Sequence, residues 1–475
     1  MTNGGTIRSK GRWYILLLIS LMYLITYLDR VNISTVAPVI SKEFGFDKVT
    51  MGFIFSAFVW SYALFQVPGG WLGDRFGPRL VLTAIVSYWS IMTALTALAA
   101  NGVSVAIVQT IGSSLLGKAL TVTAAIATSF FVIRFLFGIG EAGAFPVATR
   151  AMQLWYPRQE RGFVQGVTHS ASRLGAAIAP PIVVAIITAL GWQWVFYICG
   201  LIGLIWAIAW AISYRNLPED HRLVNEAELR HIRGTDESGN INAAKIEKRA
   251  SVPWGVLLRS PNMWAIMCAY FTYVYCLWIF LSWLPSYLVE ARGFTLLKGG
   301  LLSSLPLFAG VIGDTAGGVV SDWLLVKTGN GKIARRTVAI AGMLGCVGFI
   351  VPAALTEDAY TALYCLIGAM FFLECTIGPS WAVPMDVGGK YSGTVSGMMN
   401  MAGNFGGALS PTIFGFLVQY GSWAAPFIVA AILLVLGASV WAFWLDPDVS
   451  VVEDAAAKNR TEGEAAQTAP LPQGQ

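Results

Sequence analysis

Four charged residues stand inside two long apolar stretches of this sequence. Asp29 and Arg30 interrupt the first stretch. Arg134 and Glu141 interrupt a later one and share a helical face, separated by about 10 Å. Each charge costs on the order of 2.5 to 3.5 kcal/mol at the centre of a membrane helix. Such residues can bind an anion and exchange protons, or they can neutralise one another as structural ion pairs.

Other polar residues in apolar stretches are weaker candidates. Tyr23, Tyr27 and Arg30 fall at i, i+4 and i+7, on one stripe of a helix. His169 and Arg173 are four residues apart and either add positive charge to an anion site or pack within the helix bundle. Glu374 either balances an arginine or takes a proton, and the sequence names no partner for it. We interpret Asp314 as structural.

The sequence lacks the motifs of catalytic and metal centres. It has three histidines and contains no H-E-x-x-H, G-x-S-x-G or P-loop pattern. The six cysteines fall in apolar stretches without metal-ligand spacing, so we expect no disulfide, no metal and no cofactor. They are Cys199, Cys268, Cys276, Cys346, Cys365 and Cys375. An enzyme is therefore not expected.

The elements that position these residues follow from composition. Of 475 residues, 56% are apolar and only 12% are charged, which excludes a soluble multidomain enzyme. Apolar stretches of about 20 residues predict helices that span a bilayer. We expect an all-α polytopic membrane protein with twelve such helices, at about 13–37, 49–72, 80–100, 129–152, 164–189, 191–214, 262–289, 299–325, 337–355, 359–384, 391–419 and 421–445.

A charged interruption divides the twelve spans equally. We expect an N-terminal six-helix half at 13–214 and a C-terminal half at 262–445. Between them lies a cytoplasmic linker at 215–261, and after them a disordered cytoplasmic tail at 446–475.

The positive charges orient the chain. Arg8, Lys10 and Arg12 precede the first span, which carries no signal-peptide cleavage pattern. With that end inside, 22 of the 31 Lys and Arg residues fall in inner segments and five in outer ones. This asymmetry predicts a multi-pass protein of the cell inner (plasma) membrane with both termini cytoplasmic. A crossing at 101–128 would reverse the later loops, so we interpret that segment as an outer-face hairpin or interfacial insertion.

An internal repeat supports the two halves. The sequence G-x-x-x-D-R-x-G-x-R at 70–79 has a degenerate copy at 318–327, at an offset of 248 residues. Parallel repeats of this kind place a substrate site near the middle of the membrane.

The repeated loop motif resembles the cytoplasmic loop signature of the major facilitator superfamily. The resemblance implies gating roles for Asp74, Arg75, Arg79 and Asp322, against the alternative of a solvated loop that only anchors helices. In this interpretation the aspartate pairs with an arginine or a helix N-terminus and holds the cytoplasmic side shut.

Five further segments resemble the anion:cation symporter family within that superfamily. They lie at 27–34, 134–146, 155–162, 283–288 and 378–386. Bacterial members import sugar acids such as galactonate, glucarate and hexuronates, and animal relatives include sialic acid and vesicular glutamate transporters. The sequence departs from the family at 101–128, which is long, and at Val274, where many relatives carry a polar residue.

The resemblance implies a role for each charged residue. Arg30 and Arg134 would hold the substrate carboxylate, and Asp29 and Glu141 would handle protons. Asn400 and Asn404 are about equally well explained as polar contacts between helices. The residues expected to line the cavity by resemblance are Tyr27, Tyr62, Ser172, Tyr275, Ser380, Trp381, Asn400 and Asn404.

We therefore expect a monomeric proton symporter that imports an organic anion of the sugar-acid class by alternating access. Its partners would be the anion, protons and the lipid bilayer, without nucleic acid. A facilitator or exporter of another carboxylate, such as an aromatic acid, is the main alternative. A drug:proton antiporter is disfavoured by the paired arginines, and by Ala179-Pro180-Pro181 where that class carries a Gly-Gly signature. A sensor built on a transporter fold remains open.

Overall fold

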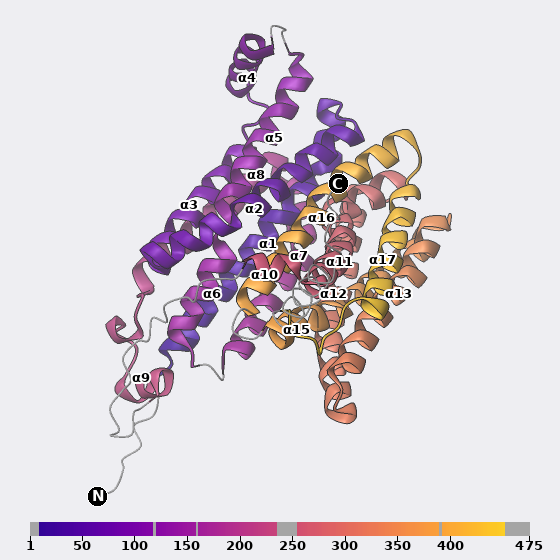
Figure 1. The fold of residues 1–475 in the computed structure, drawn as a ribbon. Coiled ribbons are helices and arrows are strands. Elements are labelled where there is room, and N and C mark those ends of the chain that lie inside the picture. Colours follow the sequence, from indigo (N-terminus) through magenta and orange to yellow (C-terminus); the bar gives the residue numbers. More distant parts are fainter. Residues whose placement is uncertain (1–8, 117–119, 158–159, 235–253, 389–391, 452–475) are drawn as a thin grey trace, which may run out of the picture. The chain divides into compact units, whose positions relative to one another are not determined.

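The computed structural model describes residues 9–116, 120–157, 160–234, 254–388 and 392–451. The described chain is helical and contains no strand (Figure 1). Its helices are α1 (Gly11–Phe44), α2 (Lys48–Phe76), α3 (Pro78–Thr96), α4 (Gly102–Leu116), α5 (Val122–Glu141), α6 (Ala144–Trp155), α7 (Arg161–Leu190), α8 (Trp192–Ser213), α9 (Glu226–Arg233), α10 (Trp254–Arg259), α11 (Pro261–Ser286), α12 (Leu296–Thr328), α13 (Gly331–Leu355), α14 (Ala359–Cys375), α15 (Ile377–Gly388), α16 (Ser392–Tyr420) and α17 (Ala425–Phe443). A 3₁₀ turn, η2, lies at Pro218–Asp220, and a π-helical turn, η3, at Tyr287–Ala291 follows α11.

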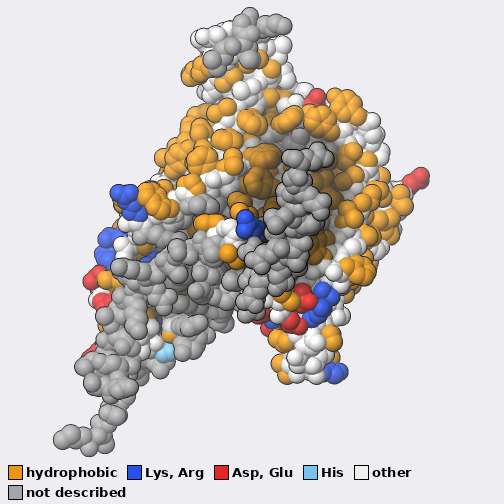
Figure 2. Space-filling view, in the orientation of Figure 1, with side chains coloured by type: hydrophobic (Ala, Val, Ile, Leu, Met, Phe, Trp, Pro, Cys, Tyr) orange, Lys and Arg blue, Asp and Glu red, His pale blue; other side chains and the backbone are white. Residues whose placement is uncertain are grey.

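The prediction of twelve membrane-spanning helices is confirmed. The described residues include twelve helical segments long and apolar enough to cross a membrane. Three of these segments join two elements each: α5 with α6, α11 with η3, and α14 with α15. Hydrophobic side chains cover much of the face shown in Figure 2, as lipid contact requires. The chain is therefore a multi-pass membrane protein.

The segment 101–128 forms a helix, a short connection and the first turns of the next span. Helix α4 has 15 residues and is shorter than a membrane span. It stands at the end of α5 that lies away from α6 (Figure 1), and the Gln109 amide donates to the Leu120 carbonyl, 3.1 Å away. Helix α5 begins at Val122, seven residues before the expected start of this span, because Thr121 caps it by accepting from the amide of Ala124. The placement of the insertion on the outer face stays a prediction.

The chain forms two compact units, each described here by itself. The first contains Met1–Lys248, Ile279–Phe308 and Ala408–Ser422, and the second contains Arg249–Trp278, Ala309–Gly407 and Trp423–Gln475. Parts of α11, α12 and α16 thus belong to the first unit. The division of the sequence into repeated halves at 215–261 stays a prediction.

Helix pairs of the first unit approach closely where a glycine faces a backbone. A Cβ added at Gly138 on α5 would lie 2.4 Å from the Phe58 carbonyl oxygen on α2. A Cβ at Gly175 on α7 would lie 2.3 Å from the Leu24 carbonyl oxygen on α1. Small residues at such crossings are the usual means of packing helices in membranes.

One end of the first unit joins α2 to α16. A Cβ at Gly52 would lie 2.6 Å from the Pro411 carbonyl oxygen, and one at Gly415 would lie 2.3 Å from the Lys48 carbonyl oxygen. The Lys48 ammonium also pairs with Glu290 in η3. The two helices therefore touch backbone to backbone at this end.

Helix α9 of the linker caps the N-terminus of α1. The buried Glu228 carboxylate accepts from the amides of Gly11 and Arg12, at 3.1 and 3.0 Å. A negative charge at this position satisfies unpaired amides and complements the helix dipole. His231, also on α9, lies 2.7 Å from Glu160, which precedes α7. The linker helix is thus fixed to the ends of two spans.

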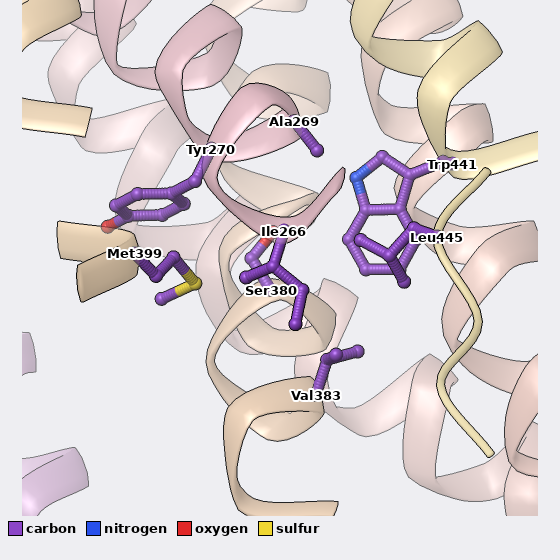
Figure 3. A pocket seen from close by; sticks show the side chains of 8 residues that line it. All are labelled: Ile266, Ala269, Tyr270, Ser380, Val383, Met399, Trp441 and Leu445. Carbon is purple, nitrogen blue, oxygen red and sulfur yellow. The ribbon is translucent and has the colours of Figure 1, made fainter. Parts of the chain in front are cut away.

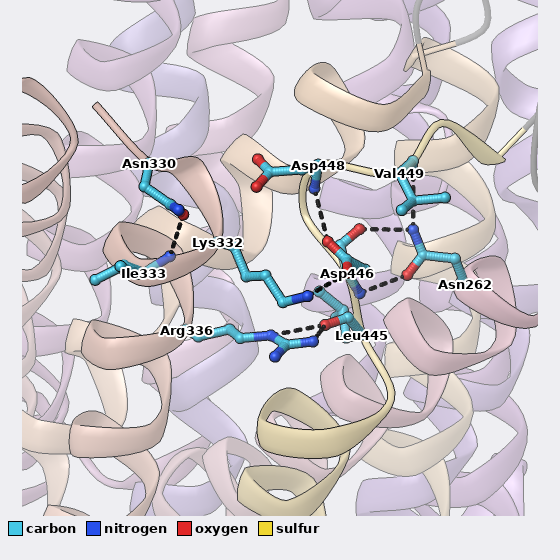
Figure 4. A network of polar contacts seen from close by, with 9 residues as sticks. All are labelled: Asn262, Asn330, Lys332, Ile333, Arg336, Leu445, Asp446, Asp448 and Val449. Carbon is cyan, nitrogen blue, oxygen red and sulfur yellow. Dashed lines mark hydrogen bonds and ion pairs between the residues drawn. The ribbon is translucent and has the colours of Figure 1, made fainter. Parts of the chain in front are cut away.

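The end of α17 is fixed within the second unit by a polar network (Figure 4). Asn262 at the start of α11 exchanges two hydrogen bonds of 2.8 Å with the backbone of Asp446. The Lys332 ammonium lies 2.6 Å from the Asp446 carboxylate, and Arg336 donates to the Leu445 carbonyl at 2.9 Å. Partial burial opposes ionisation, but the hydrogen bonds from Lys332 and the Asp448 amide, together with the charges of Lys332 and Arg336, outweigh it and lower the pKa of Asp446.

Candidate functional site

Arg30 and Glu141 meet in the interior of the first unit. Arg30 lies on α1 with 8% of its surface exposed, and Glu141 is the last residue of α5 and fully buried. The Arg30 Nε donates to Glu141 Oε1 in an ion pair. The two charged residues that the sequence placed on separate spans are thus direct partners.

Four aromatic rings surround the Arg30 guanidinium. Its central carbon lies 4.6 Å from the ring of Tyr62 and 4.8 Å from that of Tyr27. The rings of Phe58 and Phe145 are both 5.3 Å away. Cation–π contacts of this kind stabilise a cation that is removed from water. These two phenylalanines are not among the residues expected from the sequence. Phe58 stands four residues before Tyr62, and Phe145 stands four residues after Glu141.

Arg134 and Asp29 are the other two buried charges. Arg134 is 2% exposed, Asp29 is fully buried, and the charge of each acts on the other. Among the described residues, Nε and Nη1 of Arg134 and Oδ2 of Asp29 have no hydrogen-bond partner. Asn32 donates to the other Asp29 oxygen at 3.4 Å, and the Phe137 ring lies 4.4 Å from the Arg134 guanidinium.

A proline places Glu141 at the end of a helix segment. Pro146 has no amide hydrogen, so the carbonyl of Ala142 cannot receive the i→i−4 bond, and the span divides into α5 and α6. Gly69 of α2 packs on this break, since a Cβ there would lie 2.5 Å from the Gly143 Cα. The break therefore positions the carboxylate where α1, α2 and α5 meet.

The arrangement is chemically suited to an anion. The two arginines and two carboxylates balance in charge, and they are buried almost completely. In the described part of the chain, Arg30 Nη2 and Glu141 Oε2 also lack hydrogen-bond partners. Buried polar atoms normally have partners, so donors left without one mark a place for a ligand or water. A planar guanidinium binds a carboxylate through two parallel hydrogen bonds.

The other expected residues of the first unit lie near this cluster or are occupied. Tyr27 stacks on Arg30 and also lies 5.8 Å from the Arg173 guanidinium. Ser172 is buried and donates to the His169 carbonyl at 2.6 Å, so its hydroxyl is used within its own helix. The His169 ring lies 5.8 Å from that of Tyr23, which supports a packing role.

The expected residues of the C-terminal half belong to the second unit, and their contacts differ from one residue to the next. Ser380 donates to the Thr376 carbonyl at 2.7 Å and lines a small pocket shown in Figure 3. Trp381 donates to the Tyr270 hydroxyl at 3.0 Å. Among the described residues, the buried hydroxyl of Tyr275 and the amide nitrogen of Asn404 have no partner. Asn400 lies half-buried on α16.

The residues of the repeated loop motif make different contacts. The side chain of Asp74 lies outside the described residues, and Arg75 is exposed beside Trp71. Arg79 donates twice to the Ala211 carbonyl at the end of α8, at 3.0 and 2.7 Å. In the second copy, Asp322 accepts from Arg335 at 2.8 Å.

The chain is similar to proteins of known family. The model of the Major Facilitator Superfamily matches residues 19–411 and 389–472. The chain is 43% identical over 432 residues to a probable sulfoacetate transporter of Cupriavidus necator, covering 91% of this chain and 93% of that protein. It is 33% identical over 420 residues to a probable galactarate/D-glucarate transporter of Escherichia coli, covering 86% and 88%.

A solved structure shares the fold. The bacterial homologue of the human lysosomal transporter Spinster, inward-facing and unoccupied, superposes with a TM-score of 0.71 at 16% identity. The match covers 94% of this chain and 98% of that one.

Proposed function

Because the chain belongs to the Major Facilitator Superfamily, as a transporter related to organic-anion carriers and not an enzyme, we propose that it imports an organic anion together with protons. The resemblance to the anion:cation symporter family is confirmed by these relatives. The anion would carry a carboxylate or sulfonate, with sulfoacetate and sugar acids as the first classes to test. The protein would act as a monomer in the inner membrane, with both termini cytoplasmic.

The observation that carries the proposal is the buried cluster of Arg30, Glu141, Arg134 and Asp29. Arg30 pairs with Glu141, and the negative charges of Glu141 and Asp29 both act on Arg134. An anion that enters takes hydrogen bonds from the orphan donors of Arg134 and Arg30 and adds negative charge. A buried excess charge is costly, so the site favours one proton for each negative charge of the anion.

This balance connects binding to proton uptake. Glu141 and Asp29 are the acids nearest the arginines, and they would accept the protons as the anion displaces them. A monoanion such as galactonate needs one proton for neutrality, and a dianion such as glucarate or sulfoacetate needs two. The cluster holds two acids, which suits either class.

Two residues of the second unit are further candidates for substrate binding, on the resemblance and on their own polar atoms. Tyr275 and Asn404 keep polar atoms without a hydrogen-bond partner in the described chain, and they would bind hydroxyl groups or a second anionic group. The Asp322–Arg335 ion pair lies within the half at 262–445, and the contacts of Arg79 lie within the half at 13–214. These contacts would hold the helix ends of each half in place while the two halves alternate in access.

Uptake into vesicles that contain the purified protein tests the proposal. Sulfoacetate, D-glucarate and D-galactonate are supplied outside, with and without an inwardly directed proton gradient. We expect accumulation of at least one acid that increases with the gradient and is lost in Arg134→Gln, while Arg215→Gln, away from the cluster, transports normally. Uptake that does not depend on the proton gradient would contradict symport and indicate a facilitator. Normal uptake by Arg134→Gln would overturn the assigned site.

A further inference from the structure

Glu141 has a counterpart in the second half of the sequence. Glu141 and Glu374 each stand five residues before a proline, Pro146 and Pro379. Both members of this pair recur at an offset of 233 residues, whereas the loop motif recurs at 248. The first half is thus 15 residues longer between the loop motif and the glutamate, and the additional helix α4 lies in that interval. The glutamates therefore occupy the same position in the repeat.

The structure repeats the helix break at both positions. Pro379 has no amide hydrogen to donate to the Cys375 carbonyl, so the span divides here. Helix α14 ends at Cys375, one residue after Glu374, and α15 begins at Ile377. A Cβ at Gly317 of α12 would lie 2.1 Å from this carbonyl oxygen. Gly317 follows Gly69, which packs on the first break, by the same 248 residues as the loop motif. Broken helices of repeated halves are where transporters place ion and substrate sites.

Glu374 is buried as completely as Glu141 but has a different partner. Its exposed fraction is 0%, and the fully buried Tyr273 of α11 donates a hydrogen bond of 3.0 Å to its Oε2. A Cβ at Gly310 of α12 would lie 3.1 Å from the Glu374 Cγ, so the carboxyl side chain is packed against α12. Gly310 corresponds at the offset of 248 to Tyr62, which in the first unit contacts Arg30.

The other titratable groups on the packed elements are few. Asp314 follows Gly310 by one turn on α12, and its charge and that of Glu374 both act on the Cys375 thiol. Cys346 lies buried on α13, which packs along α14, and interacts with Cys276 of α11.

We propose that Glu374 is a third proton-exchanging carboxyl, outside the cluster of Asp29 and Glu141, with Tyr273 as its hydrogen-bond partner in both protonation states. A tyrosine hydroxyl donates to a carboxylate and accepts from a carboxylic acid. It can therefore hold Glu374 in place while one proton from water binds to or leaves a carboxylate oxygen. An arginine partner, as in the Arg30–Glu141 pair, can only donate, so it loses the charge attraction when the acid becomes neutral and cannot accept from the new O–H group.

The proton exchange of Glu374 is measurable without a substrate. Infrared difference spectra of the purified full-length protein, recorded between acidic and alkaline pH, report carboxylic acids through their C=O stretching band. We expect Glu374→Gln to lose one band that persists in Glu141→Gln. The matched control Glu357→Gln, an exposed residue before α14, should keep that band. Tyr273→Phe should shift its frequency, because the hydrogen bond to the carboxyl is lost.

Two results would overturn the proposal: identical spectra of wild type and Glu374→Gln, or a band that does not move in Tyr273→Phe. If Glu374→Gln does not fold, the frequency shift in Tyr273→Phe decides alone. The role in transport rests on the proposed symport. There Glu374 would carry a proton in addition to those of Glu141 and Asp29, and we expect Glu374→Gln to take up one proton fewer per anion than wild type. Absence of anion uptake in the wild type would refute the symport and leave the infrared result standing.

Discussion

Replacing each of the two buried arginines separates ligand binding from folding stability. Arg30 donates directly to Glu141, so Arg30→Ala leaves a buried carboxylate without its ion-pair partner. Breaking a buried pair in this way costs about 3 to 5 kcal/mol of stability. Nε and Nη1 of Arg134 have no hydrogen-bond partner in the described chain. Arg134→Ala therefore breaks no hydrogen bond made by these two nitrogens. We expect Arg30→Ala to unfold at a clearly lower temperature than Arg134→Ala in the absence of ligand.

Binding should respond to both substitutions. Truncating one partner of a buried, hydrogen-bonded charge pair costs about 2 to 5 kcal/mol of binding free energy. This corresponds to a Kd raised by about 30-fold to several thousand-fold. Lysine should substitute poorly at either position, because an ammonium cannot reproduce two parallel hydrogen bonds.

The assay is thermal unfolding followed by tryptophan fluorescence, with and without sulfoacetate, D-glucarate or D-galactonate. A ligand at 100 times its Kd stabilises the folded state by about 2.7 kcal/mol, so its loss is readily seen. The double variant Arg30→Ala with Glu141→Gln should recover stability without recovering binding. Equal stability of the two single variants, or normal ligand stabilisation in Arg134→Ala, would refute this reasoning.

Three further predictions follow from the same structure. The double variant Asp29→Asn with Glu141→Gln should exchange anion across vesicle membranes but lose uptake driven by a proton gradient. Gradient-driven uptake by the double variant would show that another group carries the proton. A cysteine at Lys118, outside the described residues, should react with an impermeant thiol reagent from outside, and one at 225–250 only from the cytoplasm; the reverse pattern would refute the orientation. Asp446→Asn should speed hydrogen exchange in the turn after α17 at neutral pH and not in acid. The lowered pKa of Asp446 means that its ion pair stabilises the fold above the ordinary carboxyl pKa and is lost as the pH falls through the lowered value.

The arrangement of spans was predictable because each one depends on local composition. A run of about 20 apolar residues specifies a membrane helix whatever its neighbours are, and all twelve appear. The start of α5 was placed seven residues late, because the capping by Thr121 was overlooked in an apolar context.

Contacts between helices were less predictable. The sequence marks Asp29, Arg30, Arg134 and Glu141 as a candidate site, because each charge is costly in its span. The choice of partner depends on helix rotation and on the glycine crossings, which a single sequence does not fix. The partnership of Glu374 with Tyr273 was invisible for the same reason.

The crossing of α2 and α16 has a mechanical consequence. Interdigitated side chains must be withdrawn before two helices separate. At Gly52 and Gly415, in contrast, the two helices meet through backbone atoms. The crossing is held by side chains as well, since the Thr412 hydroxyl donates to that of Ser56 at 2.8 Å and the rings of Phe53 and Phe416 lie 6.0 Å apart. It is also intolerant of added volume, because one methyl group at Gly52 would stand 2.6 Å from the Pro411 oxygen. An added methyl group would therefore shift the equilibrium toward conformations in which α2 and α16 are separated at this end. Each 1.4 kcal/mol of strain in the closed conformation would change that equilibrium by about tenfold.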